Sequence, residues 1–151
     1  MPKILFVLIT CFLFTNFTSA ESTAPSRASI EAKMAEMGKY AQANDYPTWA
    51  SFFAEDATFF NAALTDPVVG RSAIVELAGT WPVAETEIEW RTIDGARVAI
   101  GWRERRQLED GKTSGWYRGI STFLFNAEGE VQAFEGMFNL PSIMSADSNA
   151  K

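Results

Sequence analysis

The segment from residue 113 to residue 139 limits the folds open to this chain more than any other part of the sequence. Apolar and polar residues alternate along it on both sides of Asn126–Gly129, which predicts two long antiparallel strands joined by a tight turn. Strand residues two apart share a face, so one face is predicted to carry Tyr117, Gly119, Ser121, Phe123, Phe125, Gln132, Phe134, Gly136 and Phe138. Glycine and serine between large rings leave room there, as in a sheet that curves around a cavity.

The first twenty residues have the pattern of a secretory signal peptide. Lys3 supplies a positive start, Ile4–Phe14 an apolar stretch, and Thr18–Ala20 the small residues that precede cleavage after Ala20. The alternative is a membrane anchor, but the apolar stretch is shorter than the roughly 20 residues that a spanning helix needs. We therefore expect an exported protein, periplasmic or secreted, with no membrane contact after cleavage.

The mature chain is predicted to form one domain. Residues 21–26 are a polar lead-in, residues 27–140 carry the patterns of a folded domain, and residues 141–151 form a C-terminal tail. Helical spacing predicts helices at 27–43, from Pro47 to Phe53 and at 72–78, and alternation predicts strands at 57–61, 86–93 and 96–109 before the two described above. Helices first and sheet second predict an α+β fold, with the helices packed on one face of an antiparallel sheet.

Composition argues against several partners and chemistries. The chain has a formal net charge of −6 and no run of basic residues, so nucleic acid is not an expected partner. The single cysteine, Cys11, lies in the predicted signal peptide, which leaves the mature chain without a disulfide or a thiolate metal ligand. Histidine is absent, so we expect no metal and no cofactor. Acid–base chemistry near neutral pH would then use a carboxyl group, a tyrosine, a lysine or water.

Three segments resemble a known superfamily: KYAQANDYPTWASFFAEDATFFN (39–61), VVGRSAI (68–74) and GISTFLFNAEGEVQAFEGMFN (119–139). They are similar to the nuclear transport factor 2-like (NTF2-like) superfamily, in its SnoaL-like and ketosteroid-isomerase-like branch. The resemblance implies a cone-shaped fold, in which N-terminal helices pack on a strongly curved antiparallel sheet that encloses a pocket. It also implies a homodimer packed through the outer face of the sheet.

The resemblance does not carry over the catalytic residues of a ketosteroid isomerase. Such an enzyme has a tyrosine where this chain has Met37, and an oxyanion-hole aspartic acid where it has Ser121. Its general-base aspartate falls near Asn61, or on Asp66 if the loop is longer here.

A limonene-epoxide-hydrolase-like site is also incomplete. That site has an aspartate where this chain has Gly136, and an arginine and an aspartate two residues apart on one strand. Glu104 and Arg106 have this spacing in the reversed order.

The residues themselves suggest a different site around Glu104. A two-residue turn at Asp110-Gly111 would place Glu104 opposite Tyr117 on the pocket face. A carboxyl group among Trp102, Tyr117 and Phe138 is desolvated, which favours its protonated form and suits it to acid–base work, and the tyrosine could donate to a carbonyl or enolate oxygen. The alternative is that Glu104 lies at the sheet rim, in a solvated charge cluster with Arg106 and Arg103.

These patterns leave three functions open. The first is binding of a small apolar or aromatic ligand through Tyr40, Asn61, Trp102, Ser121, Phe123, Phe134 and Phe138. The second is a cofactor-independent isomerase, cyclase or hydrolase, in which Glu104 or Asp66 moves a proton and Tyr117 or Asn61 steadies an oxyanion. The third is a dimeric interaction module whose pocket is filled by its own side chains.

Overall fold

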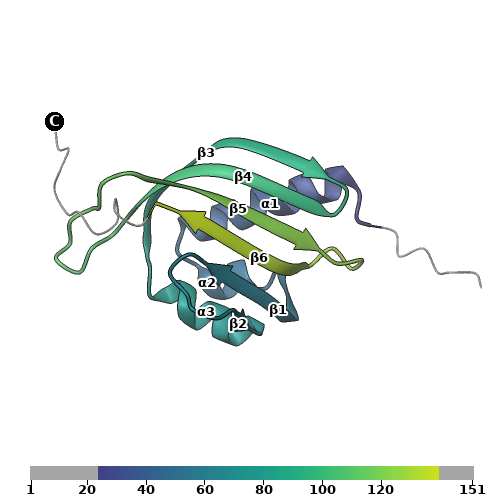
Figure 1. The fold of residues 1–151 in the computed structure, drawn as a ribbon, viewed down its shortest axis with the longest axis horizontal. Coiled ribbons are helices and arrows are strands. Elements are labelled where there is room, and N and C mark those ends of the chain that lie inside the picture. Colours follow the sequence, from purple (N-terminus) through teal and green to yellow (C-terminus); the bar gives the residue numbers. More distant parts are fainter. Residues whose placement is uncertain (1–23, 140–151) are drawn as a thin grey trace, which may run out of the picture.

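The computed structural model describes residues 24–139, so the predicted signal peptide and the C-terminal tail lie outside the described residues (Figure 1). In chain order its elements are α1 (Arg27–Gln42), α2 (Tyr46–Ala50), β1 (Phe53–Asn61), β2 (Val68–Val69), α3 (Arg71–Gly79), β3 (Val83–Asp94), β4 (Arg97–Arg106), β5 (Tyr117–Phe125) and β6 (Val131–Phe138). Every predicted helix and strand is present, and β2 is an addition. The second helix ends at Ala50, however, and Phe53, which was predicted to belong to it, begins β1. Among residues 24–139, no helix is long and apolar enough to cross a membrane.

The strands form one six-stranded sheet in the order β2-β1-β6-β5-β4-β3. Strands β3 to β6 make the predicted antiparallel meander, whereas β1 runs parallel to β6. The sheet is therefore mixed, which corrects the prediction of an antiparallel one. A parallel pair needs a long connection, and the chain from β1 to β6 provides it by running through α3 and the whole meander.

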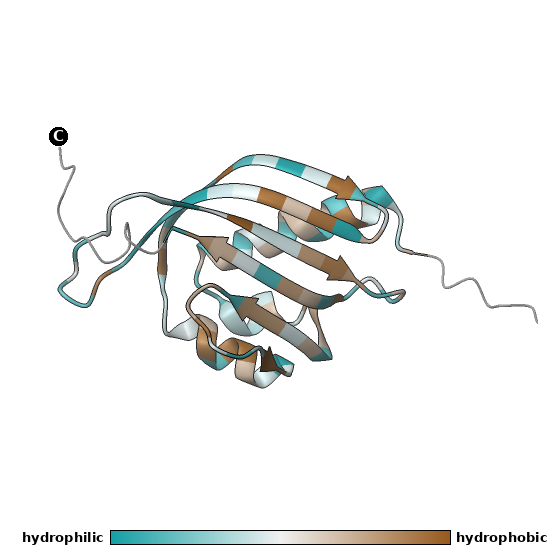
Figure 2. Cartoon of the chain, viewed as in Figure 1, coloured by the Kyte–Doolittle hydropathy of each residue, from teal (hydrophilic) through white to brown (hydrophobic). Residues whose placement is uncertain are grey.

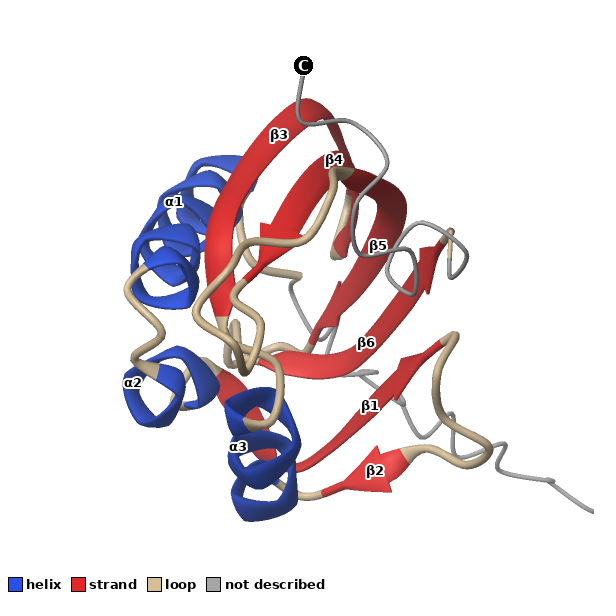
Figure 3. Cartoon of the chain, turned by 90° about the vertical axis from the view of Figure 1, so that its left-hand side faces the viewer, coloured by secondary structure: helices blue, strands red, loops and turns tan. Residues whose placement is uncertain are grey.

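The sheet bends strongly but does not close, and the helices lie on its concave side (Figure 3). The register between β3 and β4 shifts between Val83 and Glu85 and again between Ile88 and Trp90, and such irregularities bend a strand. Residues of different hydropathy alternate along the strands (Figure 2), which gives the sheet one apolar inner face. The α+β cone expected from the sequence is confirmed.

Helix α1 covers the β3 side of this concave face. Ser26 accepts a hydrogen bond from the backbone of Ser29 at 3.2 Å and so begins the helix. Its buried stripe is Ile30, Met34 and Met37, the 3.6-residue spacing predicted from the sequence. The chain then reverses at Asn44, whose φ of 56° is in the left-handed region, and α2 follows directly.

Candidate functional site

A cavity of about 590 Å³ lies between the helices and the concave face of the sheet. Met34 and Met37 of α1 and Leu77 of α3 form part of its helical wall. Its sheet wall is largely aromatic, with Phe59, Trp102, Phe123, Phe134 and Phe138. This volume is in the range of small-molecule sites, roughly 300–1,000 Å³.

Seven of the ten predicted site residues line this cavity: Asn61, Trp102, Glu104, Ser121, Phe123, Phe134 and Phe138. Tyr117 is buried next to it, 2 % exposed, without belonging to the lining. Tyr40 and Asp66 are not brought to the cavity. Tyr40 lies off the buried stripe of α1 and packs on Phe52, with ring centroids 6.1 Å apart. Asp66 is exposed in the loop between β1 and β2.

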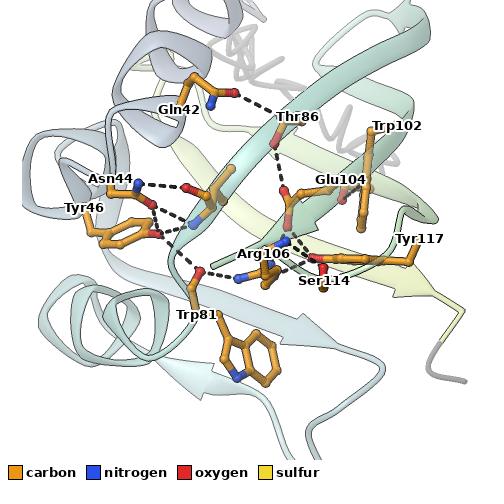
Figure 4. A network of polar contacts seen from close by, with 12 residues as sticks. Gln42, Asn44, Tyr46, Trp81, Thr86, Trp102, Glu104, Arg106, Ser114 and Tyr117 are labelled. Atoms are coloured by element: carbon orange, nitrogen blue, oxygen red, sulfur yellow. Dashed lines mark hydrogen bonds and ion pairs between the residues drawn. The ribbon is translucent and has the colours of Figure 1, made fainter. Parts of the chain in front are cut away.

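The Glu104 carboxylate is the centre of a buried polar network (Figure 4). The side chain of Glu104 is opposite Tyr117 in the β4–β5 register, as predicted, and the tyrosine hydroxyl donates to it. Thr86 donates to its other oxygen at 2.9 Å, and Arg106 Nη2 lies 2.7 Å from Oε1. All three partners are donors, so the contacts are those of an ionised carboxylate.

Besides its contact with Glu104, the Arg106 guanidinium makes two further hydrogen bonds. Its Nε donates to the Tyr117 oxygen and its Nη1 to the backbone carbonyl of Trp81. Glu104 is 9 % exposed, so the alternative of a solvated rim cluster is wrong for this residue. Arg103 is not part of the network, because it pairs with Glu87 at 2.6 Å from the other side of the sheet.

The network continues to the joint between α1 and α2. The Tyr46 hydroxyl donates to Asn44 Oδ1 at 2.5 Å and lies 3.2 Å from the Trp81 carbonyl oxygen that Arg106 also contacts. Burial raises the pKa of the Tyr46 hydroxyl above its ordinary value. Asn44 in turn binds both the N–H and the C=O of Val83, at 2.7 and 2.9 Å. Charged and polar groups on the sheet are therefore tied to the helical layer.

Two lining residues each retain an unused hydrogen-bond donor. Asn61 Oδ1 accepts from the Ala63 N–H at 2.9 Å, which fixes this atom as the oxygen and leaves the NH₂ group without a partner among the described residues. Ser121 accepts from the Trp102 indole N–H at 2.9 Å, and its own hydroxyl proton likewise has no acceptor there. Both residues are nearly buried, at 4 % and 3 % exposed, yet no sealed and unsatisfied polar atom is found in residues 24–139. The Asn61 NH₂ group is therefore accessible, and Asn61 and Ser121 both belong to the cavity lining.

The cavity opens between α1 and β3. Its exposed lining residues all come from these two elements: Ala35, Gly38, Lys39 and Gln42 on α1, and Ile88 and Arg91 on β3. The lining residues of the other elements are buried or half-buried. We refer to this opening as the mouth of the cavity.

Two direct partners of Glu104, Arg106 and Thr86, were not assigned to the site from the sequence. Arg106 is two residues from Glu104 on β4, so the strand alternation already places it on the same face. Thr86 is the β3 partner of Glu104. Parity of position along β4 is the signal that identifies Arg106. No such signal identifies Thr86, because the register shift between Ile88 and Trp90 decides which residue of β3 faces Glu104.

Burial also gives the network a testable signature in alkaline solution. Desolvation, and next the Glu104 charge, raises the pKa of the Tyr117 hydroxyl above its ordinary value of about 10. The stability contributed by the neutral hydroxyl is therefore fully present below about pH 10 and is lost as the pH rises towards the raised pKa. Wild type and Tyr117→Phe should give the same native phenolate absorbance up to about pH 11, and should differ by one tyrosine only when unfolded. A difference between the native titrations would contradict this account.

The fold, with its cavity between the helices and the bent sheet, defines an α+β cone of the NTF2-like superfamily. The SnoaL-like domain family matches residues 36–134, more than half of the chain, and the protein belongs to this family. The resemblance seen in the sequence is thus confirmed.

Solved structures support the same fold. One similar structure is that of SalBIII, described as an epoxide hydrolase/cyclase-like enzyme in pyran ring formation in the polyether salinomycin. The TM-score is 0.66 at 18 % identity, over 76 % of this chain and 94 % of that chain. No curated protein matches the sequence.

Proposed function

We propose that this protein binds a small, largely apolar molecule in the cavity. The observation that supports the proposal is the aromatic-walled cavity of about 590 Å³ with the unused donors of Asn61 and Ser121 on its wall. Rings would cover the apolar body of the ligand, and the two donors would bind an oxygen atom on it. An interaction module with a filled pocket is not supported, because the aromatic side chains leave this space open.

A glycine at the mouth allows a direct test. Gly38 lies in α1, and a Cβ at this position meets no atom within 4 Å. Gly38→Leu should therefore fold, gain about 0.5–1 kcal/mol of helix stability, and place a side chain across the mouth. We expect its affinity for a neutral probe, decanol, to fall by about tenfold, which corresponds to ~1.4 kcal/mol of binding free energy. The change in tryptophan fluorescence on binding gives the measurement, since Trp49, Trp81 and Trp102 line the cavity.

Gly79→Leu is the matched control for this variant. Gly79 is also helical and also has no atom within 4 Å of an added Cβ, but it does not line the cavity. It should bind decanol as the wild type does. Failure of the wild type to bind decanol, or equal binding by Gly38→Leu, would overturn the cavity as the site.

The second candidate function is proton-transfer catalysis in the same cavity. It is favoured by the Glu104 carboxylate on the cavity wall and by the likeness to an epoxide hydrolase/cyclase-like enzyme. Glu104 would move the proton and Asn61 would donate to the developing oxyanion. Asp66, which lies outside the cavity, has no part in this mechanism, and the Tyr117 hydroxyl already donates to Glu104.

Hydroxy-epoxide cyclisation is a suitable assay for this candidate. Turnover that is lost in folded Glu104→Gln while decanol binding is retained would establish catalysis. A wild-type protein that binds decanol but shows no turnover in this assay would leave binding as the function.

We also propose that the protein is exported and forms a homodimer through the outer face of the sheet. Export rests on the signal-peptide pattern of residues 1–20 and predicts a mature protein whose first residue is Glu21, which mass spectrometry of the exported protein would check.

The dimer is supported by Ile120 and Met137, cross-strand partners on the outer face that are 49 % and 56 % exposed. Light scattering should give the mass of two chains, and a monomer at micromolar concentration would contradict the dimer.

A further inference from the structure

The mouth of the cavity carries two positive charges that have no partner in the part of the chain that the structure describes. Lys39 on α1 and Arg91 on β3 both line the cavity and both are exposed. Neither side chain makes an ion pair or a hydrogen bond within residues 24–139. They contrast with Arg103, Arg105 and Arg118 on the outer side of the sheet, each of which pairs with a glutamate of β3.

The lining as a whole is positive although the protein is acidic. Glu104 is the one carboxylate among the described lining residues, and Arg106 neutralises it at 2.7 Å. Lys39 and Arg91 therefore remain as an excess of two positive charges, in a chain whose formal net charge is −6. An anion approaching this protein is repelled by most of its surface and attracted at the mouth.

From this charge distribution we infer that the ligand is an amphipathic acid, with an apolar body and a single carboxylate. The inference rests on the proposed binding function. The apolar body lies against the aromatic wall, where burial of apolar surface favours it. The carboxylate remains at the mouth, because moving a charge into the aromatic interior would cost its hydration, and Lys39 and Arg91 can contact it there without losing water.

Three probes with the same alkyl chain and different head groups test the inference: decanoate, decanol and decyltrimethylammonium. They are compared below their micelle concentrations, at low salt and at a pH where decanoate is ionised. We expect decanoate to bind about tenfold more tightly than decanol, and decyltrimethylammonium to bind more weakly than either. Raising the salt concentration should remove the advantage of decanoate and leave decanol unchanged.

Charge-removing variants assign the effect to the two residues. Lys39→Gln and Arg91→Gln should each weaken decanoate binding about threefold, and the double variant about tenfold, with decanol binding unchanged. Both positions are exposed, so the variants should keep the thermal stability of the wild type. Arg27→Gln is the matched control, since it removes a positive charge from α1 at an exposed position outside the cavity lining, and it should retain the preference for decanoate.

The outcomes separate this inference from the proposed function. Equal binding of decanoate and decanol, or a preference that survives in the double variant, would overturn the acidic ligand and leave a cavity that binds apolar molecules. Binding of none of the three probes would overturn both.

Discussion

Replacing Arg106 by methionine is expected to lower the free energy of unfolding by about 3 kcal/mol. The methionine keeps much of the packing volume but removes the positive charge beside Glu104, whose side chain is 12 % exposed. Removing one member of a buried ion pair leaves the other charge desolvated and uncompensated, and such changes cost about 3–5 kcal/mol. Thr86 and Tyr117 still donate to the carboxylate, so we place the expected cost at the lower end. Urea denaturation followed by circular dichroism measures it.

A double-mutant cycle with Glu104→Gln shows whether the pair is responsible. Glu104→Gln alone should also destabilise the protein, because Arg106 is then left without its counter-charge. The double variant should be more stable than the sum of the two single changes predicts, by at least about 1 kcal/mol. Strict additivity would mean that the two residues act separately and that the proximity of their charged atoms contributes nothing.

Replacing Gly119 by alanine is expected to cost about 3 kcal/mol and to disturb the cavity wall. The added methyl carbon would lie 2.3 Å from Cζ2 of Trp102 and 2.6 Å from the backbone oxygen of Met137. Trp102 is 8 % exposed and its indole N–H is bonded to Ser121, so it cannot move without losing that bond and its aromatic contacts. Overpacking of this kind typically costs 1–3 kcal/mol. Thermal unfolding and decanol titration should both report the change.

Gly101→Ala provides the comparison for this second variant. Its methyl carbon would lie even closer to a tryptophan, 2.0 Å from Nε1 of Trp90. Trp90 is 46 % exposed on the outer face, however, and can turn into solvent, so we expect a cost below about 1 kcal/mol. Equal costs at the two glycines would show that burial of the opposing tryptophan is not what decides the effect.

The sequence predicted most of this fold because alternation and helical spacing are local signals. Side-chain parity put Tyr117, Ser121, Phe123 and Phe125 on the buried face, and all four are buried. Parity says nothing about strand direction or about which strand pairs with β1. The parallel pairing of β1 with β6 depends on the path of the helical layer, which no short segment of sequence encodes.

The Glu104–Tyr117 pairing was predicted correctly from a turn that is not the one present. Gln107 bridges to Thr113, and the Leu108 N–H bonds to the Lys112 carbonyl, so residues 109–111 form a three-residue turn. One additional residue on the side of Ser114–Trp116 then restores the register in which Glu104 meets Tyr117. A compensating irregularity of this kind cannot be seen in the alternation.

The contacts of Glu104 were beyond a sequence prediction for a related reason. Parity places Arg106 and Glu104 on one face, but it does not say whether their side chains bind each other, other groups of the sheet or solvent. The prediction that Tyr40 lines the cavity is wrong. Tyr40 is next to Ala41, which lines the cavity, and only the placement of α2, which carries the chain to Phe52, decides that Tyr40 packs outside the cavity.

The seam between α1 and β3 contains its own reporters of how often the cavity opens. The backbone amides of Val83 and Thr86, on an edge strand, donate to the side-chain oxygens of Asn44 and Gln42 at 2.7 and 3.0 Å. Exchange of these two amides with deuterium requires these side-chain hydrogen bonds to break, as they do when α1 and its C-terminal turn separate from β3, whereas amides inside the β4–β5 pairing exchange only through deeper unfolding. Their exchange rates would report how often α1 and β3 separate at the mouth in the ligand-free protein. A ligand that contacts both elements should slow the exchange.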